Sequence, residues 1–116
     1  MTCDTDTTDT VSVAAYRGDT VRLTVELTDT DGLPVDVTGW TWASQVRSAP
    51  DSAVLTTMDV TVTDATGGVL ELSLDDTITA AMAVADYVFD LQATDEADDV
   101  RTLLTGALRI RADVTV

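Results

Sequence analysis

Apolar and polar residues alternate along several short stretches of this chain, and this period of two restricts the fold more than any other feature. In the clearest stretch, residues 21–28, every odd position is Val or Leu and every even position is Arg, Thr or Glu. A strand with this pattern buries one face and leaves the other in water. Comparable patterns follow in residues 11–15, 58–62, 70–74, 87–91 and 108–111. The sequence therefore predicts a domain of half-buried strands.

The inward positions of these strands should form the core. Only 4% of the residues are aromatic although 45% are hydrophobic, so we expect a mainly aliphatic core. Arg109 and Arg111 alternate with apolar residues of the last strand and are expected to point outward. The expected core residues are Leu23, Val25, Trp42, Leu72, Tyr87, Phe89, Leu108 and Ile110.

Turn and helix signals separate the strands. Residues 29–32, 64–68 and 95–99 are rich in Asp and Gly or in acidic residues, which is typical of turns. Residues 75–82 are the one helical candidate, because an Asp cap precedes about two turns of good helix formers. Seven or eight strands with one short helical crossover predict an antiparallel sandwich, and a small closed barrel is the competing architecture.

Two aromatic positions favour one kind of sandwich. In immunoglobulin-like domains a Trp is buried on an early strand, and a Tyr follows the crossover two residues before a core position. Trp42, and Tyr87 with Phe89 two residues later, match this arrangement. We therefore predict an all-β, antiparallel immunoglobulin-like β-sandwich, with residues 11–116 as a single domain. Trp40 is expected to share the face of Trp42 or to cap the edge of the sandwich.

The N-terminal residues lack this patterning. Residues 2–10 (TCDTDTTDT) are polar apart from Cys3, so we expect residues 1–10 to form a flexible acidic arm unless a partner orders it. Cys3 is the single cysteine, and we expect an exposed thiol without a disulfide partner. No signal peptide or membrane-spanning apolar run is visible, so we expect a soluble protein.

The charge balance argues against two classes of partner. The formal net charge is −15, from 21 acidic residues against 6 arginines, with no lysine. Such a surface repels phosphate backbones and anionic lipids, so neither nucleic acid nor a membrane is expected as a partner. High-GC coding bias and adaptation to high salt both explain this composition, and the sequence does not separate them.

The residue types leave little for catalysis. Without His or Lys, the usual general bases, metal ligands and Schiff-base formers are missing. The carboxylate pairs Asp75–Asp76 and Asp98–Asp99 and the pair Asp4 and Asp6 lie where turns or a helix start are expected. Residues 29–32 resemble the start of a calcium loop but lack its later ligands, and residues 95–99 suggest at most weak cation binding. We therefore predict no catalytic, cofactor or metal site.

The arginines are the remaining candidates for function. Four of them, Arg22, Arg47, Arg109 and Arg111, fall at outward strand positions. One interpretation is cross-strand pairing with the abundant Asp and Thr. The other is that they bind acidic patches on neighbouring subunits through bidentate contacts.

The order of motifs along the chain resembles a known family. The run comprises Tyr16–Thr20, Asp31–Gly39, Gln45–Arg47, Gly68–Leu74, Asp86–Gln92, Leu103–Gly106 and Asp113–Thr115. Over residues 14–116 it resembles the small immunoglobulin-like domains of structural proteins in tailed phages, and it is similar to the N-terminal domain of phage baseplate upper proteins. The resemblance implies a virion component without catalytic residues, made in the host cytoplasm.

The resemblance also implies the partners, which would be other virion proteins in a symmetric multi-copy assembly. The N-terminal arm or the last strand would dock on a neighbour. No coiled coil or receptor-binding extension follows Val116, so tail, baseplate, neck and capsid surface are all open. The alternatives are a capsid decoration protein and a carbohydrate- or surface-binding module, for which Trp40 is the aromatic candidate. The candidate partner contacts are Thr2, Cys3, Asp4, Arg109 and Arg111.

Overall fold

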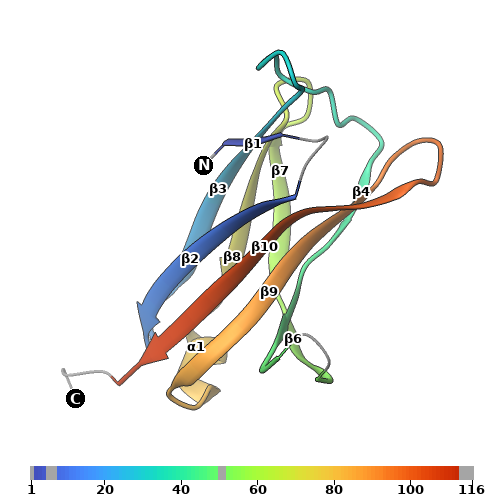
Figure 1. Ribbon diagram of the computed structural model, residues 1–116. Coiled ribbons are helices and arrows are strands. Elements are labelled where there is room, and N and C mark those ends of the chain that lie inside the picture. The colour runs from blue at the N-terminus through green and yellow to red at the C-terminus, as the bar shows by residue number, and fades with distance from the viewer. Residues whose placement is uncertain (1, 5–7, 50–51, 113–116) are drawn as a thin grey trace.

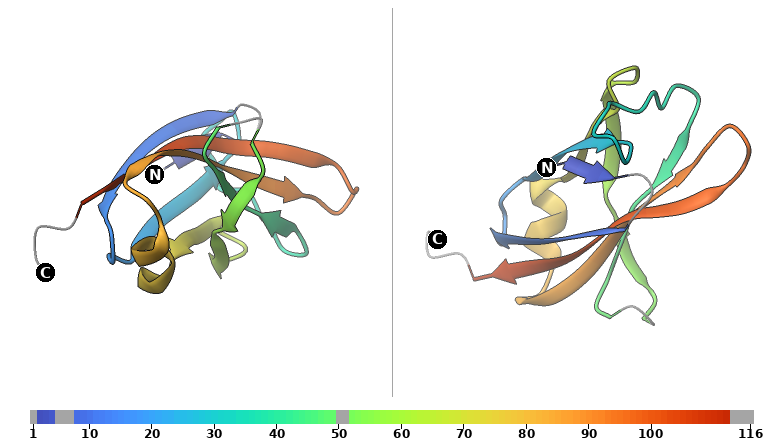
Figure 2. Two further views of the ribbon diagram at one scale, coloured as in Figure 1. Left: turned by 90° about the horizontal axis from the view of Figure 1, so that it is seen from below. Right: turned by 45° about the horizontal axis from the view of Figure 1, so that its top comes forward.

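The alternating stretches form two β-sheets that pack face to face in the computed structural model, which describes residues 2–4, 8–49 and 52–112 (Figure 1). The small sheet has the order β1 (Thr2–Asp4), β3 (Val21–Thr28), β8 (Val69–Leu74) and β7 (Asp59–Asp64). The large sheet has the order β2 (Asp9–Tyr16), β10 (Val100–Arg111), β9 (Ala85–Thr94), β5 (Gln45–Arg47) and β6 (Val54–Thr57). β4 (Thr41–Ala43) also pairs with β9. The left view of Figure 2 shows the two layers from below.

The predicted immunoglobulin-like β-sandwich is confirmed, with two differences in detail. The described residues contain ten strands instead of seven or eight, because β1 and β6 were not expected and Ser44 separates β4 from β5. Two pairings are parallel, namely β1 with β3 and β2 with β10, whereas only antiparallel pairs were predicted. The N-terminal residues thus contribute one strand to each sheet and tie the two layers together.

The core lies between the sheets and is built from their inward positions. Six of the eight predicted core residues are buried, namely Val25, Leu72, Tyr87, Phe89, Leu108 and Ile110. Leu23 is only partly buried. It faces Leu72 in a part of β3 that β1 does not flank, because β1 pairs only with Glu26–Thr28. The hydrophobic contribution of a core position therefore depends on how far the neighbouring strands extend.

Trp42 is also only partly buried, which corrects the prediction of a central Trp. Residues 40, 42, 44 and 46 face the same way, and burial increases along them toward Val46, which is fully buried. Val46 lies opposite Phe89 and so occupies the centre where the Trp was expected. Trp42 instead lies nearer the end of the sandwich, beside Trp40, with 5.9 Å between ring centroids. The expectation that the two Trp residues share a face is confirmed.

A glycine leaves room for the Phe89 ring at the centre of the large sheet. Gly106 lies between Phe89 on β9 and Val11 on β2. A Cβ atom at this position would stand 2.5 Å from the Phe89 ring and 3.0 Å from Val11. The ring therefore fills the volume that any other residue at position 106 would need.

The predicted tyrosine at the helical crossover forms the expected corner. Helix α1 (Asp76–Ala81) begins after Asp75, whose side chain accepts a hydrogen bond from the Thr77 amide, so the predicted cap is confirmed. After the helix, the Tyr87 hydroxyl donates to the carbonyl oxygen of Ala83 at 2.7 Å. This bond joins the start of β9 to the crossover four residues upstream, as in immunoglobulin-like sandwiches.

The prediction of a flexible N-terminal arm is corrected, because the described part of this segment belongs to the sheets. Thr2–Asp4 pair with Glu26–Thr28, and the hydroxyl of Thr8 donates to the carbonyl oxygen of Thr102 at 2.8 Å. Cys3 is fully buried in the core, so the expected exposed thiol is wrong. A three-residue strand in polar surroundings carries too short a pattern to be recognised, although its central residue points inward.

Replacing Gly106 with Ala should destabilise the domain without a change of backbone conformation. Gly106 has no positive φ, so the effect is steric, and displacing the Phe89 ring should lower the free energy of unfolding by about 2 kcal/mol. Urea denaturation followed by fluorescence measures this change. Ala107→Ser, on the outward side of the same strand, is the control and should leave stability nearly unchanged. Equal stability of both variants would contradict the close packing.

Replacing Tyr87 with Phe should remove the corner hydrogen bond while keeping the buried ring. We expect the free energy of unfolding to fall by about 1 kcal/mol, because the hydroxyl loses its partner without leaving a cavity. Tyr16→Phe is the matched control, since the Tyr16 side chain is 46% exposed. A larger loss for Tyr16→Phe than for Tyr87→Phe would contradict this assignment.

Candidate interaction surface

The turn carboxylates mainly hold the backbone. Asp29 accepts from the amides of Asp31 and Leu33, at 2.9 and 3.0 Å, and Asp95 accepts from those of Ala97 and Asp99 at the same distances. The predicted turns at residues 29–32 and 95–99 are thereby confirmed. Within the described ranges, no group of three potential metal ligands converges, and no helix is long and apolar enough to cross a membrane.

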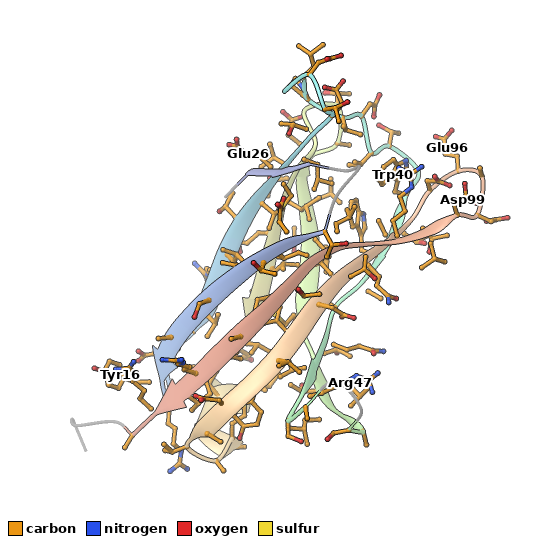
Figure 3. The ribbon with its side chains drawn as sticks, viewed as in Figure 1. Tyr16, Glu26, Trp40, Arg47, Glu96 and Asp99 are labelled. Carbon is orange, nitrogen blue, oxygen red and sulfur yellow. The ribbon has the colours of Figure 1, made fainter. Side chains whose placement is uncertain are left out.

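Acidic residues gather at the end of the sandwich that carries the β9–β10 turn, which we call the hairpin end. In Figures 1 and 3 the long β9–β10 hairpin projects at this end, with Glu96 and Asp99 near its tip. Among the residues that the structure describes, the only arginine there is Arg101, which lies 3.8 Å from Asp95. The side chains that give this end its charge are Glu26, Asp29, Asp31, Asp36, Asp64, Asp95, Glu96, Asp98 and Asp99.

A hollow of about 430 Å³ opens on the hairpin end, and Trp40 forms one of its walls. Gly39, with φ of 84°, turns the chain just before Trp40, and its missing side chain leaves room for Glu96. A Cβ atom at Gly39 would be 3.2 Å from Oε1 of Glu96, so this carboxylate lies beside the Trp40 segment. The hollow is lined by Asp36, Thr38, Trp40, Asp95, Glu96 and Ala97.

Hydrogen bonds hold one carboxylate of the hollow, that of Asp36, in its charged form. The hydroxyl and the amide of Thr38 donate to Asp36 Oδ1, at 2.6 and 2.9 Å. These hydrogen bonds hold the pKa of Asp36 below its ordinary value. An ionised carboxylate next to an aromatic face is a favourable environment for a cationic side chain, because guanidinium stacks on indole and pairs with carboxylate.

The opposite end of the sandwich carries most of the positive charge, and we call it the arginine end. Four of the six arginines lie there, namely Arg17, Arg22, Arg109 and Arg111. Acidic residues of this end are Asp19, Asp75, Asp76 and Asp86, so its charge is roughly balanced. Tyr16, labelled in Figure 3, and Val84 add exposed apolar surface, with 46% and 53% of their area accessible.

The arginines of this end differ in how far they are engaged. Arg109 pairs with Asp86 at 3.7 Å, and Arg22 with Glu71 at 3.9 Å, so both show the cross-strand pairing that was one interpretation. Arg17 donates to the carbonyl oxygen of Ala80 at 3.0 Å. Arg111 is exposed and makes no hydrogen bond or ion pair through its side chain with any residue that the structure describes.

A second, larger hollow crosses the outer face of the large sheet. It has a volume of about 540 Å³ and is floored by small side chains. Arg47, at its margin, donates to Ser52 O at 2.6 Å and to Gln45 Oε1 at 2.7 Å, so its guanidinium is already engaged. The lining comprises Thr10, Val11, Gln45, Arg47, Val88, Phe89, Asp90, Thr105, Gly106 and Ala107.

The predicted partner contacts thus separate into two groups. Arg109 and Arg111 are exposed at the arginine end, as required for a contact, whereas Cys3 is buried and cannot serve as one. The backbones of Thr2 and Asp4 are used in pairing with β3. The Trp40 hollow was not predicted from the sequence. Its walls come from residues 36–40 and 95–97, and no local sequence pattern indicates that these two segments lie side by side.

The strand order, the helical crossover and the tyrosine corner define an immunoglobulin-like β-sandwich. Among solved structures, it is similar to the N-terminal domain of phage TP901-1 ORF48, over 95% of this chain and 94% of that chain, with a TM-score of 0.62 and 15% sequence identity. The Lin-41 filamin domain is similar over 84% of this chain and 82% of that chain, with a TM-score of 0.48 and 20% identity. No protein-family model and no curated protein matches the chain. The expected resemblance to a phage domain is confirmed as a likeness of fold.

The thiol of Cys3 should be almost unreactive in the folded protein. Burial, together with the neighbouring Asp9 carboxylate, raises the pKa of Cys3 to about 11. Relative to an ordinary thiol with a pKa of 9.0, the thiolate fraction near pH 8 falls by about a hundredfold. We expect slow labelling by a thiol-specific reagent in buffer and fast labelling in denaturant. Equally fast labelling in both conditions would contradict the burial of Cys3.

Proposed function

We propose that this chain is a non-enzymatic structural subunit of a tailed virus particle and acts through protein–protein contacts. The observation that carries the proposal is the likeness to the phage TP901-1 ORF48 domain, which extends over nearly the full length of both chains. The motif order in the sequence points to the same class of protein. A compact sandwich with charged ends suits a role in which many copies contact each other or other virion proteins.

The chemistry of the side chains supports a role without catalysis. The chain has no His and no Lys, and the single Cys is buried. Several of its carboxylates accept backbone amide hydrogen bonds in turns, as at Asp29 and Asp95, or cap a helix, as at Asp75. Groups committed to holding the backbone are poorly placed to move protons or attack a substrate.

The position in the particle has two principal candidates. A tail- or baseplate-associated subunit is our first choice because of the phage resemblance, and a capsid decoration protein is the second. A carbohydrate-binding module is less favoured by the geometry. Trp40 is partly buried, tilted by 35° against Trp42, and surrounded by carboxylates instead of presenting an open aromatic platform.

Purified particles provide the test of this function. We expect the chain to copurify with virions through a density gradient, at a fixed ratio to the major structural proteins, when the fractions are analysed by mass spectrometry. Antibody labelling in the electron microscope then assigns it to tail or head. A chain that is abundant in infected cells but missing from washed particles would overturn the proposal.

A further inference from the structure

We infer that copies of this chain associate head to tail, with Arg111 of one copy entering the Trp40 hollow of the next. This inference deepens the proposed function, on which it rests, by naming the contact between subunits. The contact joins the arginine end of one sandwich to the hairpin end of its neighbour, so the two surfaces are different and the interface is heterologous. Repetition of such a contact closes into a ring or continues as an open chain.

The hollow has the chemistry that a guanidinium group needs. Trp40 supplies an aromatic wall, and Asp36 and Glu96 supply carboxylates from two separate segments. Asp36 is fixed by its hydrogen bonds to Thr38, so it is positioned without a ligand, and the Glu96 carboxylate lies close to Gly39. An arginine can stack on the indole and donate to both carboxylates, whereas a lysine would offer only a point charge.

Arg111 is the arginine best suited to this hollow. Among the described residues, Arg17, Arg22, Arg47, Arg101 and Arg109 all have a hydrogen bond or an ion pair within their own chain, and the side chain of Arg111 has none. It stands near the end of β10, where the chain leaves the large sheet (Figure 1). Its five donors are therefore available to a neighbour without breaking an existing bond.

Each end also offers apolar surface to the other. Tyr16 and Val84 are exposed at the arginine end, and Leu33 and Val100 are 60% and 64% exposed near the hairpin end. Apolar area that is removed from water stabilises the association, and the charged groups determine the relative orientation of the two copies. Head-to-tail contact sets Arg111 against the carboxylates of the hollow and avoids the repulsion between two hairpin ends, because the charge of the arginine end is roughly balanced.

The overall charge of −15 sets the conditions for association. At low ionic strength the net charges of two copies repel over long distances. At physiological ionic strength the Debye length is about 8 Å, so this repulsion is screened while contacts at hydrogen-bond distance persist. At very high salt the contact itself weakens. We therefore expect association to be strongest at intermediate ionic strength.

Charge-swap variants of the full chain test the contact by sedimentation at physiological ionic strength. The mass of the wild type should rise with protein concentration. Arg111→Glu and Glu96→Arg should each lower the association constant by about tenfold or more, and the double variant should recover much of it. Arg47→Glu and Glu71→Arg make the same kinds of charge change on the faces of the two sheets, away from both ends, and are the matched controls. Circular dichroism checks that every variant is folded.

Cysteine cross-linking tests the orientation independently. Arg111→Cys and Glu96→Cys variants are mixed under mild oxidation, and Cys3 stays unreactive because it is buried. We expect the mixed dimer to exceed both self-linked dimers. A predominant Arg111→Cys dimer would instead indicate a two-fold contact between arginine ends and would overturn the inference.

Three further results would overturn the inference: a wild type that is monomeric at all concentrations and salt levels, control variants as defective as Arg111→Glu, or a double variant without recovery. A monomeric chain whose hollow binds an arginine-rich peptide would assign the hollow to a different basic partner. These measurements use the purified chain without particles. A monomer that is nevertheless found in virions would therefore refute the head-to-tail contact and leave the proposed function intact.

Discussion

The close packing of Phe89 over Gly106 is the contact on which the rest of the sandwich depends. β9 and β10 form the longest pairing among the described residues, and this contact packs the Phe89 ring over their backbone at the centre of the large sheet. β2 joins the far side of β10, while β4 and β5 join β9. Because both β9 and β10 run from one end of the sandwich to the other, they also place Arg111 and Glu96 at opposite ends.

The two ends can therefore differ in charge without a difference in fold. A strand of this sandwich needs apolar residues only on its inward face. The outward positions and the turns can therefore carry any polar residue. At the hairpin end the turns use Asp to bind backbone amides, and the unused carboxylate oxygens leave a negative surface. At the arginine end the last strand alternates Leu108 and Ile110 with arginines. The same pattern that buries the core thus distributes the charge.

Local patterns predict what depends on neighbours in sequence. The alternation in residues 21–28 gives β3, and the Tyr87–Phe89 pair gives the corner, because each rests on side-chain direction within one strand. Local patterns do not predict features that depend on contacts between distant segments. Cys3 is buried because β1 pairs with the edge of β3, and Trp42 is only partly buried because it lies opposite the end of β9. The hollow at Trp40 forms only when residues 36–40 meet the β9–β10 turn.

The abundance of Asp and the absence of Lys have general explanations in coding bias or in adaptation to salt, and both act on the composition of the whole surface. Neither predicts that four of the six arginines lie at one end while the carboxylates crowd the other. Uniformly distributed carboxylates would only keep copies apart. An uneven distribution makes the two ends different, because two hairpin ends repel each other while the roughly balanced arginine end is not repelled in the same way. In the head-to-tail contact that we infer, salt regulates assembly, because it screens the net repulsion at a lower concentration than it screens the contact.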